Sequence, residues 1–169
     1  GSGGRGLQPP AQAQAQGRCW GSLYPHQPSF QRQQVVISER VQRWAEDPLK
    51  GCKTLNYSAM VLARLEASQA GAGDVLLRSS QGGLCCSSSA NLLVQEGGQW
   101  LTPPLSSGAL PGVMRARGVA MGLIQEARLA DSLPAEQPAL LLNSLDCRPV
   151  NQIAEPLAEP LFVQLLGSD

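Results

Sequence analysis

Two lysines stand three residues apart in the segment "KGCKTLNY" at positions 50–57, and every other basic side chain in the 169 residues is an arginine. A partly desolvated lysine has a lowered pKa, and its free amine can form a Schiff base with an aldehyde cofactor. Lys53 ends an extended segment directly before a predicted helix, which makes it the candidate nucleophile. A solvated surface lysine is the alternative interpretation, and it is the one we expect to hold for Lys50.

Two further segments carry groups that can hold a phosphate. "ALPGVMR" places Gly112 before a predicted helix, whose first backbone N–H groups and dipole attract anions. "LLLNSLDCRPV" ends a buried strand with Asn143 and Ser144, whose polar side chains either bind a phosphate or complete the turn. A Pro-Gly turn that simply caps a helix is the alternative at Gly112. Because the Walker and Rossmann fingerprints are both absent, such a phosphate site would be an irregular one.

The small polar residues of "CCSSSAN" at positions 85–91 form a third candidate segment. Small side chains allow a ligand to approach the backbone closely, although serine runs are also common in turns. The adjacent cysteines Cys85 and Cys86 are expected to point to opposite faces of a strand.

The composition argues against several other functions. The 13 acidic and 13 basic side chains cancel, and no basic run is present, so nucleic acid and anionic membrane surfaces are not expected partners. No apolar run is long enough to span a bilayer and no signal peptide is recognisable, which predicts a cytoplasmic protein. A small molecule or another protein remains the expected partner.

Cysteine and histidine usage excludes two more kinds of site. The five cysteines are an odd number without C-x-x-C spacing, so neither a disulfide framework nor a structural zinc site is expected. The single histidine, His26, lies in a Pro-rich stretch, which makes a histidine-based metal site or a catalytic triad hard to build. We therefore expect no metal.

The pattern along the chain predicts a single mixed α+β domain after a linker. Residues 1–30 are rich in Gly, Pro, Gln and Ala, which predicts a linker or interdomain arm, and residues 31–169 would form the folded part. "QVVISERV" predicts a strand, and "DVLLRSSQGGLCC" and "ANLLVQEGGQWLTPP" each predict a hairpin. "PALLLNSLDCRPVNQI" predicts two more strands with a polar turn between them.

Three helices are expected between and after these strands. The first lies in "NYSAMVLARLEASQAG", with Tyr57, Val61, Leu62 and Leu65 on its apolar face and Gly71 as its end. The second begins at the Pro-Gly of "LPGVMRARGVAMGLIQEARL" and continues through Val119, Leu123, Ile124 and Ala127 on one face. The third is the tail "PLAEPLFVQLLGSD". Strands and helices in this order favour an α+β domain over a repeating βαβ array.

Four segments follow one another along the chain, "GCKTLNY", "GGLCCSSSANLLV", "WLTPPLSSGALPGVMR" and "LLNSLDCRPV". In this order they resemble the class IV pyridoxal-phosphate enzymes, the family of branched-chain and D-amino-acid aminotransferases and aminodeoxychorismate lyase. The resemblance runs from about Arg40 to Ile153 and covers the C-terminal, cofactor-binding domain of the family. It implies the D-amino-acid aminotransferase-like architecture, a mixed sheet with packed helices, pyridoxal 5'-phosphate as cofactor and a homodimer.

The resemblance also assigns roles to residues of this chain. Lys53 would hold the cofactor as a Schiff base and act as the general base. Tyr57 lies near the position that contacts the cofactor's phenolic oxygen, whereas Val113, Met114 and Ser144 lie at its phosphate. The full implied cofactor-binding set is Lys53, Tyr57, Cys86, Asn91, Gly112, Val113, Met114, Asn143 and Ser144.

Two departures from the family pattern stand out. Cys86 occupies the position where the family has a glutamate that pairs with the pyridine nitrogen, and a neutral thiol keeps that nitrogen protonated poorly. The family's N-terminal domain, which supplies an arginine to the phosphate, has no counterpart here. The chain is therefore expected to be either a fragment of a longer enzyme or a truncated, degenerate relative.

Met114 and the forms "KTLNY" and "NSL" favour aminodeoxychorismate lyase within this family. Such an enzyme converts 4-amino-4-deoxychorismate to 4-aminobenzoate and pyruvate in folate biosynthesis. An amino-acid aminotransferase of the same family is one alternative. A non-catalytic remnant that serves as an interaction module is another, since Cys86 replaces the glutamate and half of the family's length is missing.

Overall fold

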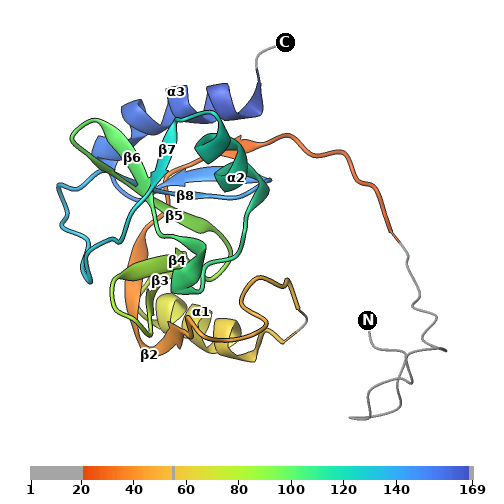
Figure 1. Cartoon of the computed structure of the whole chain (residues 1–169), viewed down its shortest axis with the longest axis vertical. Helices are drawn as coiled ribbons and strands as arrows, with labels where there is room; N and C mark the ends of the chain where they lie inside the picture. The colour runs from red at the N-terminus through yellow and green to blue at the C-terminus, as the bar shows by residue number, and fades with distance from the viewer. Residues whose placement is uncertain (1–20, 55, 168–169) are drawn as a thin grey trace.

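The computed structural model describes residues 21–54 and 56–167 and shows a mixed α+β fold, as predicted (Figure 1). Among these residues, none of the helices is both long and apolar enough to cross a membrane. In chain order the strands and α-helices are β1 (Ser29–Phe30), β2 (Val35–Arg43), α1 (Ser58–Gln69), β3 (Asp74–Ser79), β4 (Leu84–Ser87), β5 (Asn91–Glu96), β6 (Gln99–Thr102), α2 (Val113–Ala120), β7 (Ile124–Glu126), β8 (Ala139–Leu142), β9 (Asp146–Pro149) and α3 (Glu155–Leu166).

The strands form one nine-stranded sheet with β5 at its branching point. The main path runs β1-β9-β8-β5-β4-β3-β2. Outside this path, β6 pairs with β5, and β7 pairs with β6. Both predicted hairpins, β3 with β4 and β5 with β6, are present and antiparallel. Three other pairs, β1 with β9, β2 with β3 and β6 with β7, are parallel.

Apolar side chains cover both faces of the central strands. On one face, Val75 and Leu77 of β3 pack under α1. On the same strand, Leu76 points the other way and packs with Leu92 and Leu141. The helix α3 covers a third cluster through Leu161, Phe162 and Leu165, which pack with Leu93, Leu140 and Leu142 of β5 and β8. Buried on both faces, β3, β5 and β8 form a rigid platform for the turns at their ends.

The predicted apolar face of α1 is wrong. Val61, Leu62 and Leu65 are 62%, 60% and 53% exposed, while the small side chains of Ala63 and Ala67 are buried against the sheet. Alanine has no side-chain atoms beyond Cβ, so this face allows the helix to lie close to the strands, and the larger side chains are left outside. Periodicity located the helix but not the side that packs.

The second helix is also shorter than predicted. α2 ends at Ala120 because Gly122 adopts a left-handed φ of +71°. The Gly122 N–H donates to the Val119 carbonyl, and the Leu123 N–H donates to the Gly118 carbonyl, each at 3.0 Å, which is the Schellman pattern of a helix C-terminus. Residues 124–126, predicted as helix, instead form β7 beside β6.

The folded part begins slightly before the predicted boundary at residue 31. β1 pairs with β9, and the ring of Phe30 stacks on Phe162 with centroids 6.3 Å apart. Residues 21–28 before it are exposed and lack regular structure, and Figure 1 shows them leaving the sheet as an extended arm. The first 20 residues of the predicted arm lie outside the described residues.

Gly122→Ala should lower the free energy of unfolding by about 1 kcal/mol, because a Cβ disfavours the left-handed conformation. No atom lies within 4 Å of the position that this Cβ would occupy, so the effect would come from the backbone alone. Gly51→Ala is the matched control, since its Cβ would also meet nothing and its φ is not positive. Urea denaturation of both variants would test this, and equal stability of the two would contradict it.

Candidate functional site

Asn91 is where three of the predicted functional segments meet. As the first residue of β5, it pairs with Cys86 on β4 and with Leu142 on β8. The loop of residues 87–90, here called the serine loop, joins β4 to β5 beside it. The turn of residues 143–146, here called the asparagine turn, follows β8 directly. The sheet thus places the serine loop and the asparagine turn at the same end of adjacent strands.

The Pro-Gly turn before α2 is held at the same place. The Asn91 side-chain amide donates to the Leu110 carbonyl at 2.9 Å. A Cβ at Gly112 would lie 2.1 Å from Asn91 Oδ1, so a larger residue would displace the Asn91 side chain from this contact. Gly112 is also the N-cap of α2 and offers no side chain to its first N–H groups. The backbone N–H groups of Val113 and Met114 therefore remain available to an anion.

The asparagine turn is built by the side chain of Asn143. Its Oδ1 accepts hydrogen bonds from the Leu145 N–H at 2.7 Å and the Asp146 N–H at 3.0 Å, and its Nδ2 donates to the Ser89 carbonyl at 3.5 Å. Of the two interpretations of Asn143, completing the turn is the one the structure supports. Ser144 is exposed on the turn, and its hydroxyl is the group left for a ligand.

The expectation that Cys85 and Cys86 point to opposite faces is wrong. The register between β3 and β4 shifts between Leu77 and Arg78, so that Cys86 pairs with Leu77 while Leu84 pairs with Arg78. Cys85 is the extra residue of this β-bulge, and a bulge breaks the strict alternation of side chains. Both cysteines consequently lie in the apolar cluster under α1.

This arrangement fixes the protonation of the two thiols. The pKa of Cys86 is raised well above its usual value because the thiol is hydrogen-bonded to Cys85 and is buried. The same hydrogen bond lowers the pKa of Cys85, with help from the nearby Arg43 and Arg115 guanidinium groups. Cys86 is therefore a neutral thiol at neutral pH. It supplies no negative charge at the position where the family pattern has a glutamate.

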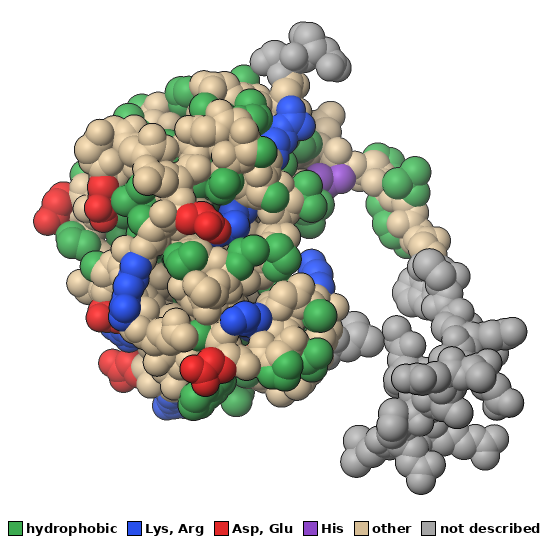
Figure 2. Space-filling view, in the orientation of Figure 1, with side chains coloured by type: hydrophobic (Ala, Val, Ile, Leu, Met, Phe, Trp, Pro, Cys, Tyr) green, Lys and Arg blue, Asp and Glu red, His purple; other side chains and the backbone are tan. Residues whose placement is uncertain are grey.

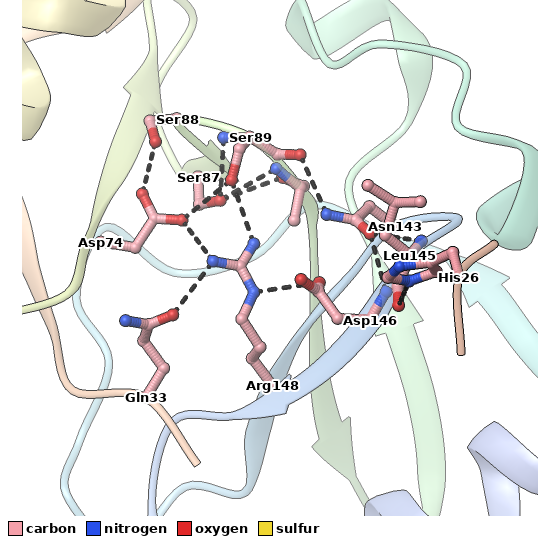
Figure 3. A network of polar contacts seen from close by, with 11 residues as sticks. His26, Gln33, Asp74, Ser87, Ser88, Ser89, Asn143, Leu145, Asp146 and Arg148 are labelled. Atoms are coloured by element: carbon pink, nitrogen blue, oxygen red, sulfur yellow. Dashed lines mark hydrogen bonds and ion pairs between the residues drawn. The ribbon is translucent and has the colours of Figure 1, made fainter. Parts of the chain in front are cut away.

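A buried ion pair between Asp74 and Arg148, which was not predicted from the sequence, lies next to the serine loop (Figure 3). Asp74 is 0% exposed, and its Oδ2 lies 3.1 Å from Nη1 of Arg148. The Ser88 hydroxyl donates to Asp74 Oδ1 at 2.6 Å, and the Ser89 hydroxyl donates to Oδ2 at 3.3 Å. The available signal was an acidic residue directly before the apolar run of the strand "DVLLRS".

Asp74 is ionised despite its position. Burial alone would raise its pKa, but hydrogen bonds from the Ser88 hydroxyl and the Val75 N–H, together with the charge of Arg148, outweigh burial and hold the pKa below its ordinary value. The charged group paired with the Asp74 carboxylate is the guanidinium of Arg148, and Figure 3 draws this pair beside the serine loop. Asp74 is therefore satisfied by the protein itself.

Lys53 belongs to a different segment from this group of turns. Lys53 is exposed in the segment between β2 and α1, which Figure 1 shows as a loop reaching away from the sheet. Among the described residues, no hydrogen bond or ion pair involves its amine. Tyr57, 42% exposed, is the N-cap of α1. Lys50, expected to be solvated, is instead half-buried, and its amine donates to the Ala45 carbonyl.

Two surface hollows lie away from all of these residues. One, of about 470 Å³, is lined by residues of β6, α2 and β7, among them Gln99, Val119 and Glu126. The other, of about 330 Å³, is mainly apolar and includes Val35, Leu133 and Val150. On the face shown in Figure 2, acidic and basic side chains are interspersed. Neither hollow is lined by Lys53 or by a residue of the turns around Asn91.

Comparison with known proteins identifies the family. The family model described as amino-transferase class IV matches residues 1–153. A provisionally assigned 4-amino-4-deoxychorismate lyase from Legionella pneumophila subsp. pneumophila str. Philadelphia 1 has a TM-score of 0.72 and 25% identity, over 85% of this chain and 57% of that one. A search of the curated proteins found no match.

Two further solved structures have the same fold. A provisionally assigned amino-acid aminotransferase from Mesorhizobium loti has a TM-score of 0.67 and 27% identity, over 75% of this chain and 63% of that one. The branched-chain amino acid aminotransferase from Thermobaculum terrenum, in its PLP form, has a TM-score of 0.68 over 82% of this chain and 52% of that one, but is only 18% identical. The expected fold is confirmed, and the chain spans between 52% and 63% of the length of these three relatives.

The lowered pKa of Asp74 predicts a specific acid sensitivity. A carboxylate whose folded pKa is depressed contributes stability above its unfolded pKa, and that contribution is lost as the pH falls through the folded value. The difference in unfolding free energy between the wild type and Asp74→Asn should therefore be largest above about pH 4 and shrink below it. Urea denaturation from pH 7 to pH 3 would measure it.

Glu155→Gln is the control for this experiment, because Glu155 forms an exposed ion pair with Arg32 at 3.3 Å. Its effect on the unfolding free energy should be small at every pH. A constant difference between wild type and Asp74→Asn across the pH range would contradict the assignment of a depressed pKa to Asp74.

Proposed function

The chain belongs to the class IV aminotransferases, a family that depends on pyridoxal phosphate, and we propose that it binds this cofactor and acts as a lyase. The proposed reaction converts 4-amino-4-deoxychorismate to 4-aminobenzoate and pyruvate. One observation carries the proposal: Asn91 brings the Gly112 turn and the asparagine turn to the end of the same strand, where each offers groups suited to a phosphate. The Legionella relative supports the choice of lyase, as do "NSL" and Met114.

The residues at the proposed phosphate end fit the cofactor. Gly112 lies so close to the Asn91 side chain that a larger residue would displace that side chain. The N–H groups of Val113 and Met114 would donate to the phosphate oxygens, favoured by the positive end of the helix dipole. The exposed hydroxyl of Ser144 would donate from the neighbouring turn. None of these groups carries a full positive charge, so a cation from elsewhere would strengthen binding.

The residue proposed to face the pyridine ring fits the cofactor less well. In the family pattern a carboxylate holds the proton on the pyridine nitrogen, and here that position is the neutral, buried thiol of Cys86. Bound pyridoxal phosphate supplies an electron sink for the carbanion formed at the substrate. Without an anionic partner for the ring nitrogen, we propose that this chain holds the cofactor but uses it weakly.

Lys53 has two proposed roles in the reaction. Its amine would hold the cofactor covalently, and once released by the substrate amine, its Nζ would remove the proton from the carbon that bears that amine. Lys53 is exposed here, and these roles require its amine to lie against the turns around Asn91.

Two alternatives are kept for specific reasons. An amino-acid aminotransferase is supported by the Mesorhizobium relative, and it would require a keto acid as amino acceptor. Pyruvate release from 4-amino-4-deoxychorismate without an added keto acid separates the lyase from it. A non-catalytic remnant is supported by Cys86, a neutral thiol at the position where the family pattern has a glutamate.

We also propose that the protein forms a homodimer and is located in the cytoplasm. Val61, Leu62 and Leu65 form an exposed apolar strip on α1, which favours contact with another surface and supports the proposed homodimer. Cys52, Cys85, Cys86 and Cys147 are free thiols, as expected for the reducing environment of the cytoplasm.

Covalent labelling tests the proposed cofactor site. The protein would be mixed with pyridoxal phosphate, reduced with borohydride and digested, and the labelled lysine identified by mass spectrometry. A single adduct on Lys53, retained in Lys50→Ala and lost in Lys53→Ala, is the expected result. Label divided evenly between Lys50, Lys53 and the amino terminus would show that no site is formed.

Cys86→Glu should increase lyase turnover, because the carboxylate restores a partner for the pyridine nitrogen. General estimates for charge-assisted hydrogen bonds of about 1.5–3 kcal/mol correspond to a gain on the order of tenfold or more. Cys86→Gln is the matched control, since it has a similar size but no charge and should give no increase. Unchanged or lower turnover in Cys86→Glu, at normal cofactor occupancy, would contradict this role of position 86.

A further inference from the structure

The guanidinium of Arg148 contacts four separate parts of the chain (Figure 3). Its Nη1 donates to Asp74 on β3 and to Gln33 before β2, each at 3.1 Å. Its Nη2 donates to the Ser89 hydroxyl in the serine loop at 3.1 Å. Its Nε lies 3.1 Å from Oδ1 of Asp146 at the end of the asparagine turn. Arg148 is only 13% exposed, and no part of this role was evident from the sequence.

We propose that Asp74 and Arg148 are positioning residues that hold the serine loop against the asparagine turn, and that this arrangement sets the affinity of the site for a phosphate group. The inference rests on the proposed function, because it takes Ser144 on the asparagine turn to be a phosphate ligand. It adds two residues to that site, neither of which would touch the cofactor.

The hydroxyl groups of the serine loop support a positioning role. Ser87 Oγ accepts from the Ala90 N–H at 3.0 Å and from the Ser89 N–H at 3.3 Å, which closes the loop on itself. Ser88 and Ser89 direct their hydroxyls to Asp74. These three hydroxyl groups are engaged with protein partners, so the serines serve to fix the backbone of the loop. Asp74 is the residue that the loop is fixed to.

The serine loop then restrains the asparagine turn. Asn143 donates from Nδ2 to the Ser89 carbonyl while its Oδ1 holds the Leu145 and Asp146 N–H groups. Arg148 reaches the same two segments through Ser89 Oγ and Asp146 Oδ1. The position of Ser144 therefore depends on two connections to the loop. A ligand site held in advance in this way loses less free energy to ordering when the ligand binds.

Ser89→Ala is the variant that removes the contact between Arg148 and the serine loop with the least change elsewhere. It removes the hydroxyl that joins Arg148 to the loop, while the Asp74 and Arg148 charges remain paired. Arg148→Met is the stronger variant, but it leaves the buried Asp74 carboxylate without its partner and can unfold the chain. The matched controls are Ser80→Ala, whose hydroxyl accepts from the Ala45 N–H at 3.0 Å, and Arg32→Met, which loses the exposed pair with Glu155.

Two measurements on the full chain test the proposal. Amide hydrogen exchange without ligand reports whether residues 89–90 and 145–146 loosen together. Titration with pyridoxal phosphate and with pyridoxal, which lacks the phosphate, reports whether the effect is specific to the phosphate. A general loss of stability would weaken both ligands equally, whereas a positioning role weakens only the phosphorylated one.

Ser89→Ala is expected to speed exchange at both segments and to weaken the binding of pyridoxal phosphate about threefold to tenfold, the size expected for the loss of one typical hydrogen bond, with the binding of pyridoxal unchanged. Arg148→Met, if folded, should have a larger effect of the same kind, and the two controls should have none. Unchanged exchange at residues 145–146 in Ser89→Ala overturns the proposal, as does equal weakening of the two ligands.

The same data separate this inference from the proposed function. If the wild type binds pyridoxal phosphate no better than pyridoxal, the phosphate site and the proposed function both fail. If the wild type prefers pyridoxal phosphate and Ser89→Ala retains that preference in full, the proposed function stands and the positioning role of Asp74 and Arg148 is overturned.

Discussion

The candidate site depends on the contacts that one residue, Asn91, makes through its backbone and its side chain. Its backbone sets the register between β4, β5 and β8, and its side-chain amide fixes the Leu110 carbonyl. Asn91 approaches Gly112 so closely that a side chain at position 112 would displace the Asn91 amide. Three segments that are distant in sequence therefore reach one end of the sheet, and the buried strands β5 and β8 keep that end rigid.

Charge is distributed unevenly over this end of the sheet. The one fully buried carboxylate, that of Asp74 among the described residues, is neutralised by Arg148 and serves the serine loop. Position 86, where the family pattern places a carboxylate, is a neutral thiol whose pKa is raised by Cys85 and by burial. The chain thus retains dipolar groups for a phosphate but offers no charge to a pyridine ring. Binding and catalysis are separable properties in such a site.

The sequence predicted the elements that depend on residues close together in the chain. Both hairpins, the strands around Asn143, the α3 segment and the glycine before α2 follow from alternation, turn residues and caps, and all are present. It did not predict which side of α1 packs, because Ala63 and Ala67 are buried for close approach and not for their hydrophobicity. It missed the end of α2 at Gly122, the bulge at Cys85 and the partner of Asp74, since each depends on register or on residues far away. The roles of Lys53 and Ser144 remain predictions.

The most direct measurement of the central claim is an amide NMR titration of the chain with pyridoxal phosphate and, separately, with pyridoxal. If the turns around Asn91 form one phosphate site, the amides of Val113, Met114 and Ser144 will shift with pyridoxal phosphate and remain unchanged with pyridoxal. Shifts at Val113 and Met114 without Ser144, or equal shifts with both ligands, would contradict a phosphate site built from these turns.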